Sequence, residues 1–170
     1  MRRMKTARLI AQPIVIALVM ALGVRHAVHI YSIPSGSMEP TLQVGDHILV
    51  TPYRGAEPHK GDVIVFHSPV NREELMVKRI AGVAGDLVEG NQGKLIVPAG
   101  CFFVLGDNRA NSFDSRQWGV LPRSEIVGRA RLILWSSGNG TMQPLANAAP
   151  LARVIHPPRL HTERLFRVIE

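Results

Sequence analysis

Three Gly-Asp pairs, each followed by a short apolar run, restrict the fold of this chain more than any other feature. They stand in "GDHILV" (45–50), "GDVIVF" (61–66) and "GDLVEG" (85–90). Gly and Asp are typical turn residues, and the Val and Ile that follow them favour pleated strands. Short strands at this spacing predict a mostly β, compact, antiparallel and barrel-like domain over residues 31–136.

Two further segments of this region predict strands, and one does not. "KLIVPAG" (94–100) and "CFFVLGD" (101–107) indicate a hairpin that turns at Pro98-Ala99-Gly100, and "EIVGRARLILW" (125–135) indicates a strand with a bulge at Gly128. The polar segment 106–119 shows no alternation and lies between strong strands. It is either a solvated loop or a site, since loops on rigid scaffolds commonly carry function.

The first thirty residues predict a membrane anchor. Residues 1–8 are basic and contain no acid, and an apolar run follows from Leu9 to Val24. Extended to Ile30, with Arg25 and His26 reaching the interface, the run is long enough for one transmembrane helix over residues 9–30. A cleaved signal peptide and a buried core helix are the alternatives. In the anchor interpretation, residues 1–8 stay in the cytoplasm and the rest lies on the other side.

The remaining composition narrows the partners and excludes some chemistry. The net charge is +7, which suits an anionic membrane surface or nucleic acid, and the single cysteine excludes an internal disulfide. No histidine or cysteine spacing fits a metal site, so we expect no metal and no cofactor. Residues 137–158 are linker-like. The arginine-rich segment 159–170 is a frayed tail, packs back on the domain, or lies on a membrane surface.

The stretch "IPSGSMEPTL" (33–42) contains the best candidate nucleophile, Ser37, because Pro34 and Gly36 allow a sharp turn that exposes its hydroxyl. A nucleophilic serine needs a base, and Lys78 is a candidate. In a strand over 75–80, Lys78 shares one face with Met76 and Ile80, whose apolar side chains would lower its pKa. On residue chemistry alone, a turn serine and a surface lysine are the commoner interpretations.

Five motifs favour the interpretation of Ser37 and Lys78 as a catalytic pair. "SIPSGSMEPTL", "GDHILV", "KGDVIVF", "VKRIAGVAGD" and "GDNRANSFDSRQWG" follow one another from about Tyr31 to Trp135, and together they resemble the type I signal peptidase family, serine proteases with a Ser-Lys dyad. One departure is Ala110, where many members have a second aspartate. Only 19 residues separate Asp86 from Gly106, so the large inserted subdomain of some bacterial members is absent.

The resemblance implies a role for each matching residue. Ser37 would be the nucleophile and Lys78 the base, and the Ser35 hydroxyl would join the Ser37 N–H in an oxyanion hole. Ser112 would orient Lys78. The pairs Asp114 with Arg116, and Arg79 with Asp107, would hold the loop 106–119 against the lysine strand. Substrate-binding residues would be Ile33, Pro34, Met76 and Val77, which favour small side chains of the Ala-X-Ala type.

The expected protein is thus a monomeric, membrane-anchored serine endopeptidase. It would remove signal peptides from exported preproteins, from the bacterial inner membrane with its catalytic domain in the periplasm, and would bind no nucleic acid. A mitochondrial inner-membrane peptidase of the same chemistry is one alternative. A self-cleaving repressor of the SOS type would need a DNA-binding domain where the anchor stands. A non-enzymatic, membrane-tethered β module that binds lipid is the third.

Overall fold

The computed structural model describes residues 15–17, 29–91, 93–137 and 164–169. Its strands are β1 (His29–Ser32), β2 (Asp46–Thr51), β3 (Val63–His67), β4 (Leu75–Gly82), β5 (Leu87–Gly90), β6 (Gly93–Ile96), β7 (Cys101–Leu105), β8 (Leu121–Pro122), β9 (Ile126–Ser136) and β10 (Arg167–Val168). Its short helices include η1 (Gly36–Met38), α2 (Ser115–Trp118) and η2 (Arg123–Glu125).

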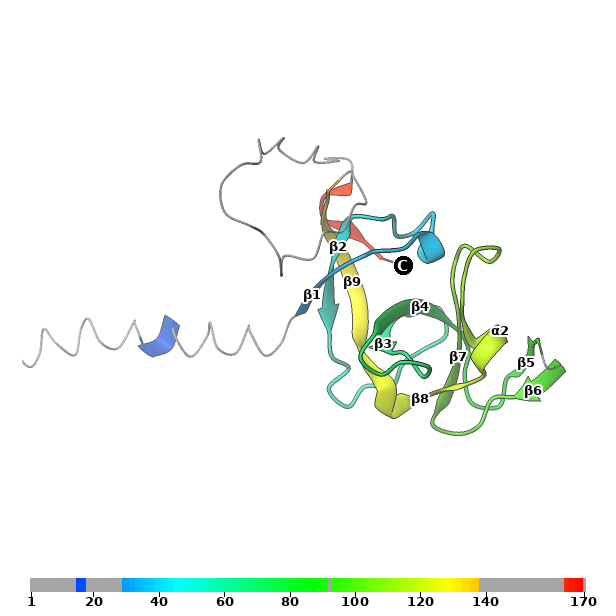
Figure 1. Cartoon of the computed structure of the whole chain (residues 1–170). Coiled ribbons are helices and arrows are strands. Elements are labelled where there is room, and N and C mark those ends of the chain that lie inside the picture. Colours follow the sequence, from blue (N-terminus) through cyan, green and yellow to red (C-terminus); the bar gives the residue numbers. More distant parts are fainter. Residues whose placement is uncertain (1–14, 18–28, 92, 138–163, 170) are drawn as a thin grey trace, which may run out of the picture.

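An eight-stranded sheet in the order β1-β2-β9-β3-β4-β7-β8 dominates the molecule, and β10 pairs beside β9. Strand β9 is the long central element of Figure 1. It pairs with β2 along one edge, and with β3 and β10 at different points of its length. Every one of these pairings is antiparallel, as the sequence predicts. β5 and β6 form a separate hairpin that projects from the body (Figure 1).

The three Gly-Asp pairs build the same turn three times. Gly45, Gly61 and Gly85 all have φ near +90° (+90°, +95° and +87°), a conformation that favours glycine. In each turn the aspartate N–H donates to the carbonyl three residues earlier, at 2.9–3.1 Å. Its carboxylate also accepts from the N–H of that earlier residue, at 2.9–3.2 Å. Because both bonds close the same four residues, each turn fixes where the next strand begins.

Strand β3 separates two apolar clusters, because its side chains are buried on both faces. Val63 and Val65 join a cluster with β2, β9 and the segment around η1, whereas Ile64 and Phe66 join one with β4, β7 and β8. Lys78 of β4 pairs with Ile64 and therefore lies at the edge of the second cluster. Residues next to Ser37 and Lys78, such as Met38 and Ile80, thus belong to the core and anchor both segments.

The prediction of a hairpin that turns at Pro98-Ala99-Gly100 is wrong. Segment 93–96 pairs back on β5, and β7 crosses to pair with β4 and β8. Burial explains the difference, since the three central residues of β7 are buried while β6 is mostly exposed. A strand with buried side chains on both faces needs the cover of the main sheet, which a projecting hairpin cannot give.

Two finer expectations also need correction. The sheet is not seen to close into a barrel, because within the described residues β1 and β8 end the strand order without pairing with each other. The bulge predicted at Gly128 lies one residue earlier, at Val127, and Gly128 itself pairs with Val65. Glycine is needed there because an added Cβ would lie 2.5 Å from the Thr51 carbonyl oxygen.

The predicted anchor, residues 9–30, falls almost entirely outside the described residues. Its last two residues, His29 and Ile30, belong instead to strand β1 and pair with β2, so the predicted C-terminal bound of the anchor is wrong. Within the described ranges, no helix has the length and apolar character needed to cross a membrane. The predicted linker 137–158 also lies outside them, apart from Ser137. Of the C-terminal segment, residues 164–169 are described, and they pack back on the domain through β10 and through Ile169, which is 5% exposed.

Candidate active site

Ser37 lies in the middle of η1, directly after β1. The chain is pinned before this turn, because the Ile33 N–H donates to the Asp46 carbonyl at 2.8 Å and the Gly45 N–H donates to the Ile33 carbonyl at 2.9 Å. After Ser37, Met38 is 1% exposed and packs into the core. The serine is therefore held between two fixed points, with its hydroxyl partly exposed.

Lys78 of β4 reaches the hydroxyl of Ser37. The Lys78 ammonium donates to Ser37 Oγ at 2.7 Å, although 41 residues separate them in the sequence. The lysine is only 3% exposed. Burial lowers the pKa of Lys78 from its ordinary value of 10.5, and the carboxylates of Asp114 and Glu74 oppose this shift. A lysine with a lowered pKa can be neutral in part of its population, as a base must be.

The loop after β7 holds the backbone around Ser37. The Asn108 N–H donates to the Ser37 carbonyl at 3.1 Å, and the Asn108 side-chain amide donates to the Gly36 carbonyl at 3.2 Å. Gly106 approaches the same turn so closely that an added Cβ would lie 2.5 Å from the Ser37 carbonyl oxygen. These contacts fix the orientation of the turn relative to the lysine strand.

Two arginine–aspartate pairs, Arg79 with Asp107 and Arg116 with Asp114, lie in and beside this loop. Arg79 donates to both carboxylate oxygens of Asp107 at 2.9 Å. Burial by itself would raise the pKa of Asp107, but the bonds from Arg79 hold it below its usual value. Asp114 is fully buried, accepts from Arg116 Nε at 2.8 Å and from the Gly106 N–H at 3.0 Å, and caps α2.

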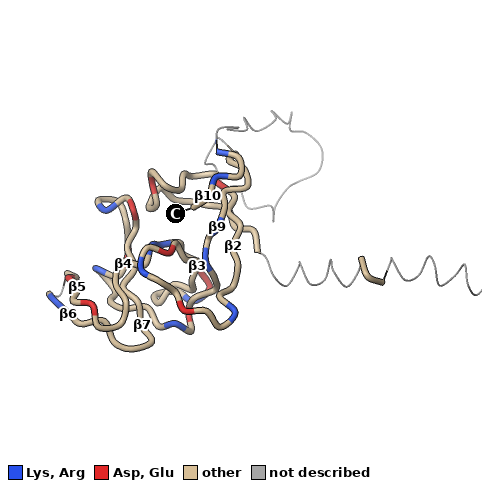
Figure 2. Tube along the Cα trace, turned by 180° about the vertical axis from the view of Figure 1, so that it is seen from behind, with Lys and Arg blue, Asp and Glu red and all other residues tan. Residues whose placement is uncertain are grey.

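The pKa of Asp114 follows the same balance. Burial would raise it, but the hydrogen bonds from Arg116 and Gly106 keep it below its usual value. Asp114 therefore stays charged and holds Gly106, the first residue of the loop that follows β7. Its negative charge lies near enough to Lys78 to favour the charged form of that lysine. Figure 2 shows how closely acidic and basic residues are interspersed along the trace in this part of the molecule.

The two remaining serines take different positions. Ser35 Oγ lies 3.4 Å from Ser37 Oγ, on the exposed side of the turn. Ser112 lies beside Gly106, where its side chain would clash with an added Cβ. Its hydroxyl is buried and lies near the Asp114 carboxylate, where it helps to hold the pKa of Asp114 down. No bond from Ser112 to Lys78 is found among the described residues.

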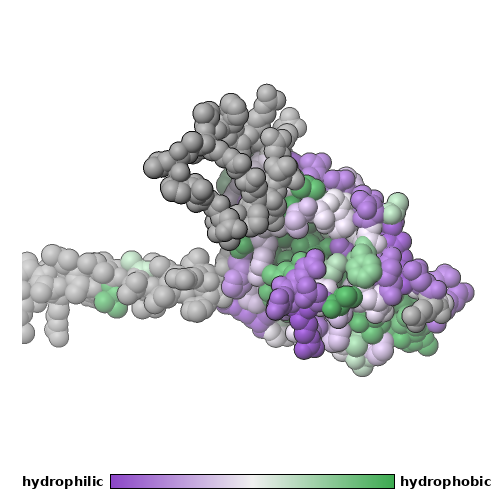
Figure 3. All heavy atoms as spheres, in the orientation of Figure 1, coloured by the Kyte–Doolittle hydropathy of each residue, from purple (hydrophilic) through white to green (hydrophobic). Residues whose placement is uncertain are grey.

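A groove of about 170 Å³ leads to the Ser37–Lys78 pair. One wall is the segment 31–35, and the other is the segment 74–78 at the start of β4. The predicted substrate-binding residues Ile33, Pro34, Met76 and Val77 all line it. On the face seen in Figure 3, apolar residues gather around a central hollow and hydrophilic residues frame it. No three His, Cys, Asp or Glu side chains of the described ranges come together as metal ligands.

Sequence reasoning missed some residues that shape this site. Asn108 stands in a quoted motif, so its presence was visible, but its bonds to the Ser37 turn were not. Thr41 also stands in a quoted motif, but no role was predicted for it, and its hydroxyl accepts a hydrogen bond from Arg79 at 3.3 Å. Its carbonyl accepts another at 3.0 Å from Arg164, 123 residues further along the chain.

Comparison with known proteins bears on this geometry. The family model described as signal peptidase, peptidase S26, matches residues 6–98 and 91–135. A probable signal peptidase I-2 of Synechocystis sp. is 34% identical over 157 residues, covering 74% of this chain and 72% of that protein. A signal peptidase I of Leptolyngbya laminosa is 36% identical over 153 residues, covering 71% and 75%.

A third relative and one solved structure complete the comparison. The signal peptidase I of Aquifex aeolicus is 30% identical over 210 residues, covering 73% of this chain and 82% of that protein. The crystal structure of a signal peptidase I from Enterococcus faecalis has a TM-score of 0.38 at 26% identity, covering 43% of this chain and 96% of that chain.

Proposed function

The chain belongs to the signal peptidase family, peptidase S26, and on that premise we propose that it removes signal peptides from exported preproteins with Ser37 as nucleophile and Lys78 as base. Members of this family are serine endopeptidases. The observation that carries the assignment is the 2.7 Å contact between Lys78 Nζ and Ser37 Oγ. A lysine that is 3% exposed and contacts a partly exposed serine hydroxyl has the geometry of an activated nucleophile.

The reaction would proceed through an acyl-enzyme. Neutral Lys78 takes the proton of the Ser37 hydroxyl as Oγ bonds to the carbonyl carbon of the scissile peptide. The resulting ammonium then gives this proton to the leaving amine, and the C–N bond breaks. A water molecule, deprotonated by Lys78, attacks the ester, and the proton returns to Ser37 as the signal peptide leaves.

Negative charge develops on the carbonyl oxygen during both attacks. The Ser37 N–H and the Ser35 hydroxyl are the proposed donors to this oxygen. The 3.4 Å separation of the two serine hydroxyls supports Ser35, because it places a donor beside the attacking atom. Loss of one such donor typically raises the barrier by about 2.7–4 kcal/mol.

The groove supports a preference for small substrate side chains. Ile33 is 3% exposed and Val77 is partly buried, so their surfaces leave a narrow apolar wall beside the reacting pair. In an extended peptide every second side chain points to the same side, so alanines at alternate positions would both face this wall. We therefore propose cleavage after Ala-X-Ala, with Pro34 and Met76 completing the contact surface.

The proposed location of the protein rests on the basic and apolar segments at the start of its sequence. We propose a bacterial inner-membrane protein with residues 1–8 in the cytoplasm, residues 9–28 across the bilayer and a monomeric catalytic domain in the periplasm, because β1 of that domain already begins at His29. A cleavage site next to the membrane suits a nucleophile that stands only nine residues after the proposed anchor. A reporter fused after Glu170 should be active only if it works outside the cytoplasm, and cytoplasmic activity would contradict this topology.

The dyad is tested with purified full-length protein in detergent and a preprotein that carries an Ala-X-Ala site. Ser37→Ala and Lys78→Ala should each abolish cleavage. Lys78→Arg should fail as well, because a guanidinium does not deprotonate in a protein. Lys94→Ala is the matched control, since Lys94 is exposed on β6 and lies outside the groove. Near-normal turnover by a folded Ser37→Ala or Lys78→Ala variant would refute the mechanism.

A further inference from the structure

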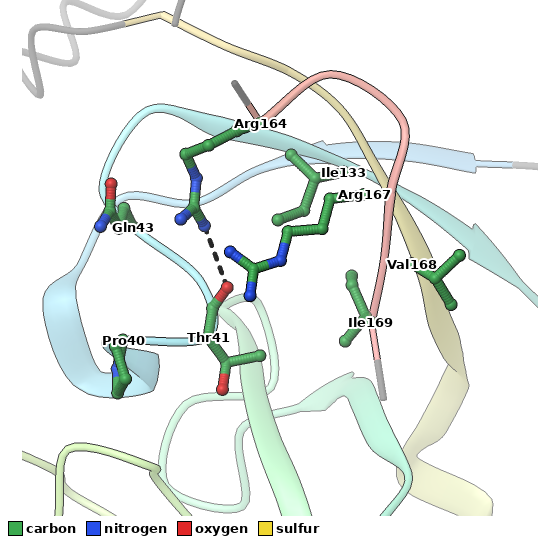
Figure 4. A pocket seen from close by; sticks show the side chains of 8 residues that line it. All are labelled: Pro40, Thr41, Gln43, Ile133, Arg164, Arg167, Val168 and Ile169. Atoms are coloured by element: carbon green, nitrogen blue, oxygen red, sulfur yellow. Dashed lines mark hydrogen bonds between the residues drawn. The ribbon is translucent and has the colours of Figure 1, made fainter. Parts of the chain in front are cut away.

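A second cavity lies outside the substrate groove, between the C-terminal segment and the loop that follows η1. It has a volume of about 600 Å³. Thr41 and Gln43 line it from the loop, Ile133 lines it from β9, and Arg164 and Arg167 line it from the C-terminal segment. Figure 4 shows both arginine side chains directed towards the loop at Thr41.

The charge of Arg164 is compensated. Its guanidinium donates to both carboxylate oxygens of Asp46, at 3.2 Å and 2.6 Å, and to the Thr41 carbonyl at 3.0 Å. Both side chains of this ion pair are buried, with exposed fractions of 11% for Arg164 and 0% for Asp46. Arg164 is thus a fixed wall of the cavity.

The charge of Arg167 is not compensated in the same way. None of the ion pairs among the described residues includes it, and its residue is exposed. Its guanidinium enters the cavity beside that of Arg164 (Figure 4). Among the described residues, two guanidinium groups with a single carboxylate leave one net positive charge in a partly enclosed space, where an anion would be attracted more strongly than in bulk water.

We propose that this cavity binds a phosphate-bearing anion through Arg167, with Arg164 as the fixed second wall. The planar fork of an arginine matches the oxygens of a phosphate, which can accept two parallel hydrogen bonds. The Gln43 amide is a further polar group on the opposite wall, whereas the Thr41 hydroxyl points away from the arginines and is bonded to Arg79. The volume falls within the usual range of ligand pockets, so there is room for a group attached to the phosphate.

The surroundings of Arg167 favour the headgroup of an acidic phospholipid over free phosphate. Phe166 is 71% exposed and Val168 is 61% exposed, and they flank Arg167 in the chain. Exposed apolar side chains next to an uncompensated cation are typical of a segment that lies at a membrane surface. This choice of source rests on the proposed membrane location, whereas the binding of a phosphate group does not.

A ligand bound in this cavity would affect the turn that carries Ser37 through contacts of Thr41. This residue accepts hydrogen bonds from Arg164 and from Arg79, and Arg79 holds Asp107 of the loop that fixes Ser37. A ligand that bridges Arg167 and the wall at Thr41 would therefore stiffen the segment between η1 and β2. The cavity would then couple the membrane surface to the geometry of the nucleophile.

The test measures binding, so it does not depend on peptidase activity. Full-length protein in non-ionic detergent is titrated calorimetrically with inorganic phosphate, with glycerophosphoglycerol as a soluble acidic headgroup and with glycerophosphocholine as a zwitterionic one, at constant ionic strength. The variant is Arg167→Gln. The matched control is Arg131→Gln, which removes an exposed arginine of β9 that does not line the cavity.

We expect saturable binding of phosphate or glycerophosphoglycerol, weaker binding of glycerophosphocholine, and an affinity at least about tenfold lower in Arg167→Gln but unchanged in Arg131→Gln. Tighter binding of glycerophosphoglycerol than of phosphate would identify the lipid headgroup as the source, and the reverse order would identify free phosphate. If Arg167→Gln melts early, Arg167→Lys replaces it and should also bind more weakly. The proposal is overturned if neither anion binds saturably, or if the Arg167 variants bind as the wild type does.

Discussion

The ion pair between Arg164 and Asp46 offers the sharpest test of how the C-terminal segment supports the site. Arg164→Met would remove the only cationic partner that the described residues give to Asp46, a carboxylate that is 0% exposed. Breaking a buried pair from one side typically destabilises a protein by about 3–5 kcal/mol, because the remaining charge stays buried and uncompensated. For a chain of 170 residues, this corresponds to a fall in Tm of roughly 6–20 °C.

The matched control removes an exposed pair by the same substitution. Arg123 donates to Glu57 at 2.9 Å, but the exposed fractions of the two side chains are 35% and 73%. Arg123→Met should therefore lower the stability by no more than about 1 kcal/mol. The double variant Asp46→Asn/Arg164→Met should be more stable than Arg164→Met, because it no longer buries an unpaired charge.

Thermal and urea unfolding in detergent, followed by circular dichroism, measure these differences. Peptidase activity measured well below the melting temperature gives a second readout, because Arg164 also holds the Thr41 carbonyl. We expect Arg164→Met to lose activity even where it is folded. A stability within about 1 kcal/mol of wild type would show that the C-terminal segment does not brace the domain, and the reasoning from burial would then be wrong.

Three further perturbations test the site itself. Activity should rise with pH through an apparent pKa below 10.5, because Lys78 must lose its proton to act as a base. Glu74→Gln should move this rising part of the pH–rate profile to lower pH, because the Glu74 carboxylate favours the charged form of Lys78. A profile that does not move would exclude that influence of Glu74. Gly106→Ala should abolish turnover by pushing the Ser37 carbonyl aside, which a kinetic assay on the folded variant checks. The pKa of Asp114 is lowered in the folded protein, so its contribution to stability is present above its unfolded pKa and is lost as pH falls through the folded value. Asp114→Asn should accordingly flatten the acid limb of the stability–pH curve, and an unchanged slope would contradict this assignment.

Local sequence patterns were sufficient for the strands that stand next to strong turn signals. β2 and β3 follow glycines whose positive φ requires the residue type that the sequence has, and this links motif and structure directly. The hairpin at Pro98-Ala99-Gly100 failed because two turns, at 90–93 and at 98–100, compete for segment 93–96. Only the burial of β7 against β4 decides between them, and burial is a property of the assembled sheet.

The candidate site was predictable to a similar degree. The face that Lys78 shares with Met76 and Ile80 follows from strand periodicity, and both Lys78 and Ile80 are buried on it. The contact with Ser37 came from the resemblance of motifs, since no local rule joins residues 41 positions apart. The clamp between Arg164 and Asp46 spans 118 positions and has no local signal, so the sequence left the C-terminal segment open.

The place of β9 in the sheet has a consequence for the time at which such a protease becomes active. β2 leads away from the serine turn and β3 leads into the lysine strand, yet the two pair with each other only through β9, the last long strand to be synthesised. A nascent chain that ends before Ile126 contains both reactive residues but no ladder that holds them in register. Long-range pairing of this kind must wait for the complete segment. Among the described strands, the order of the sheet therefore leaves the segments of the serine and the lysine without a shared ladder until nearly the whole domain has been synthesised.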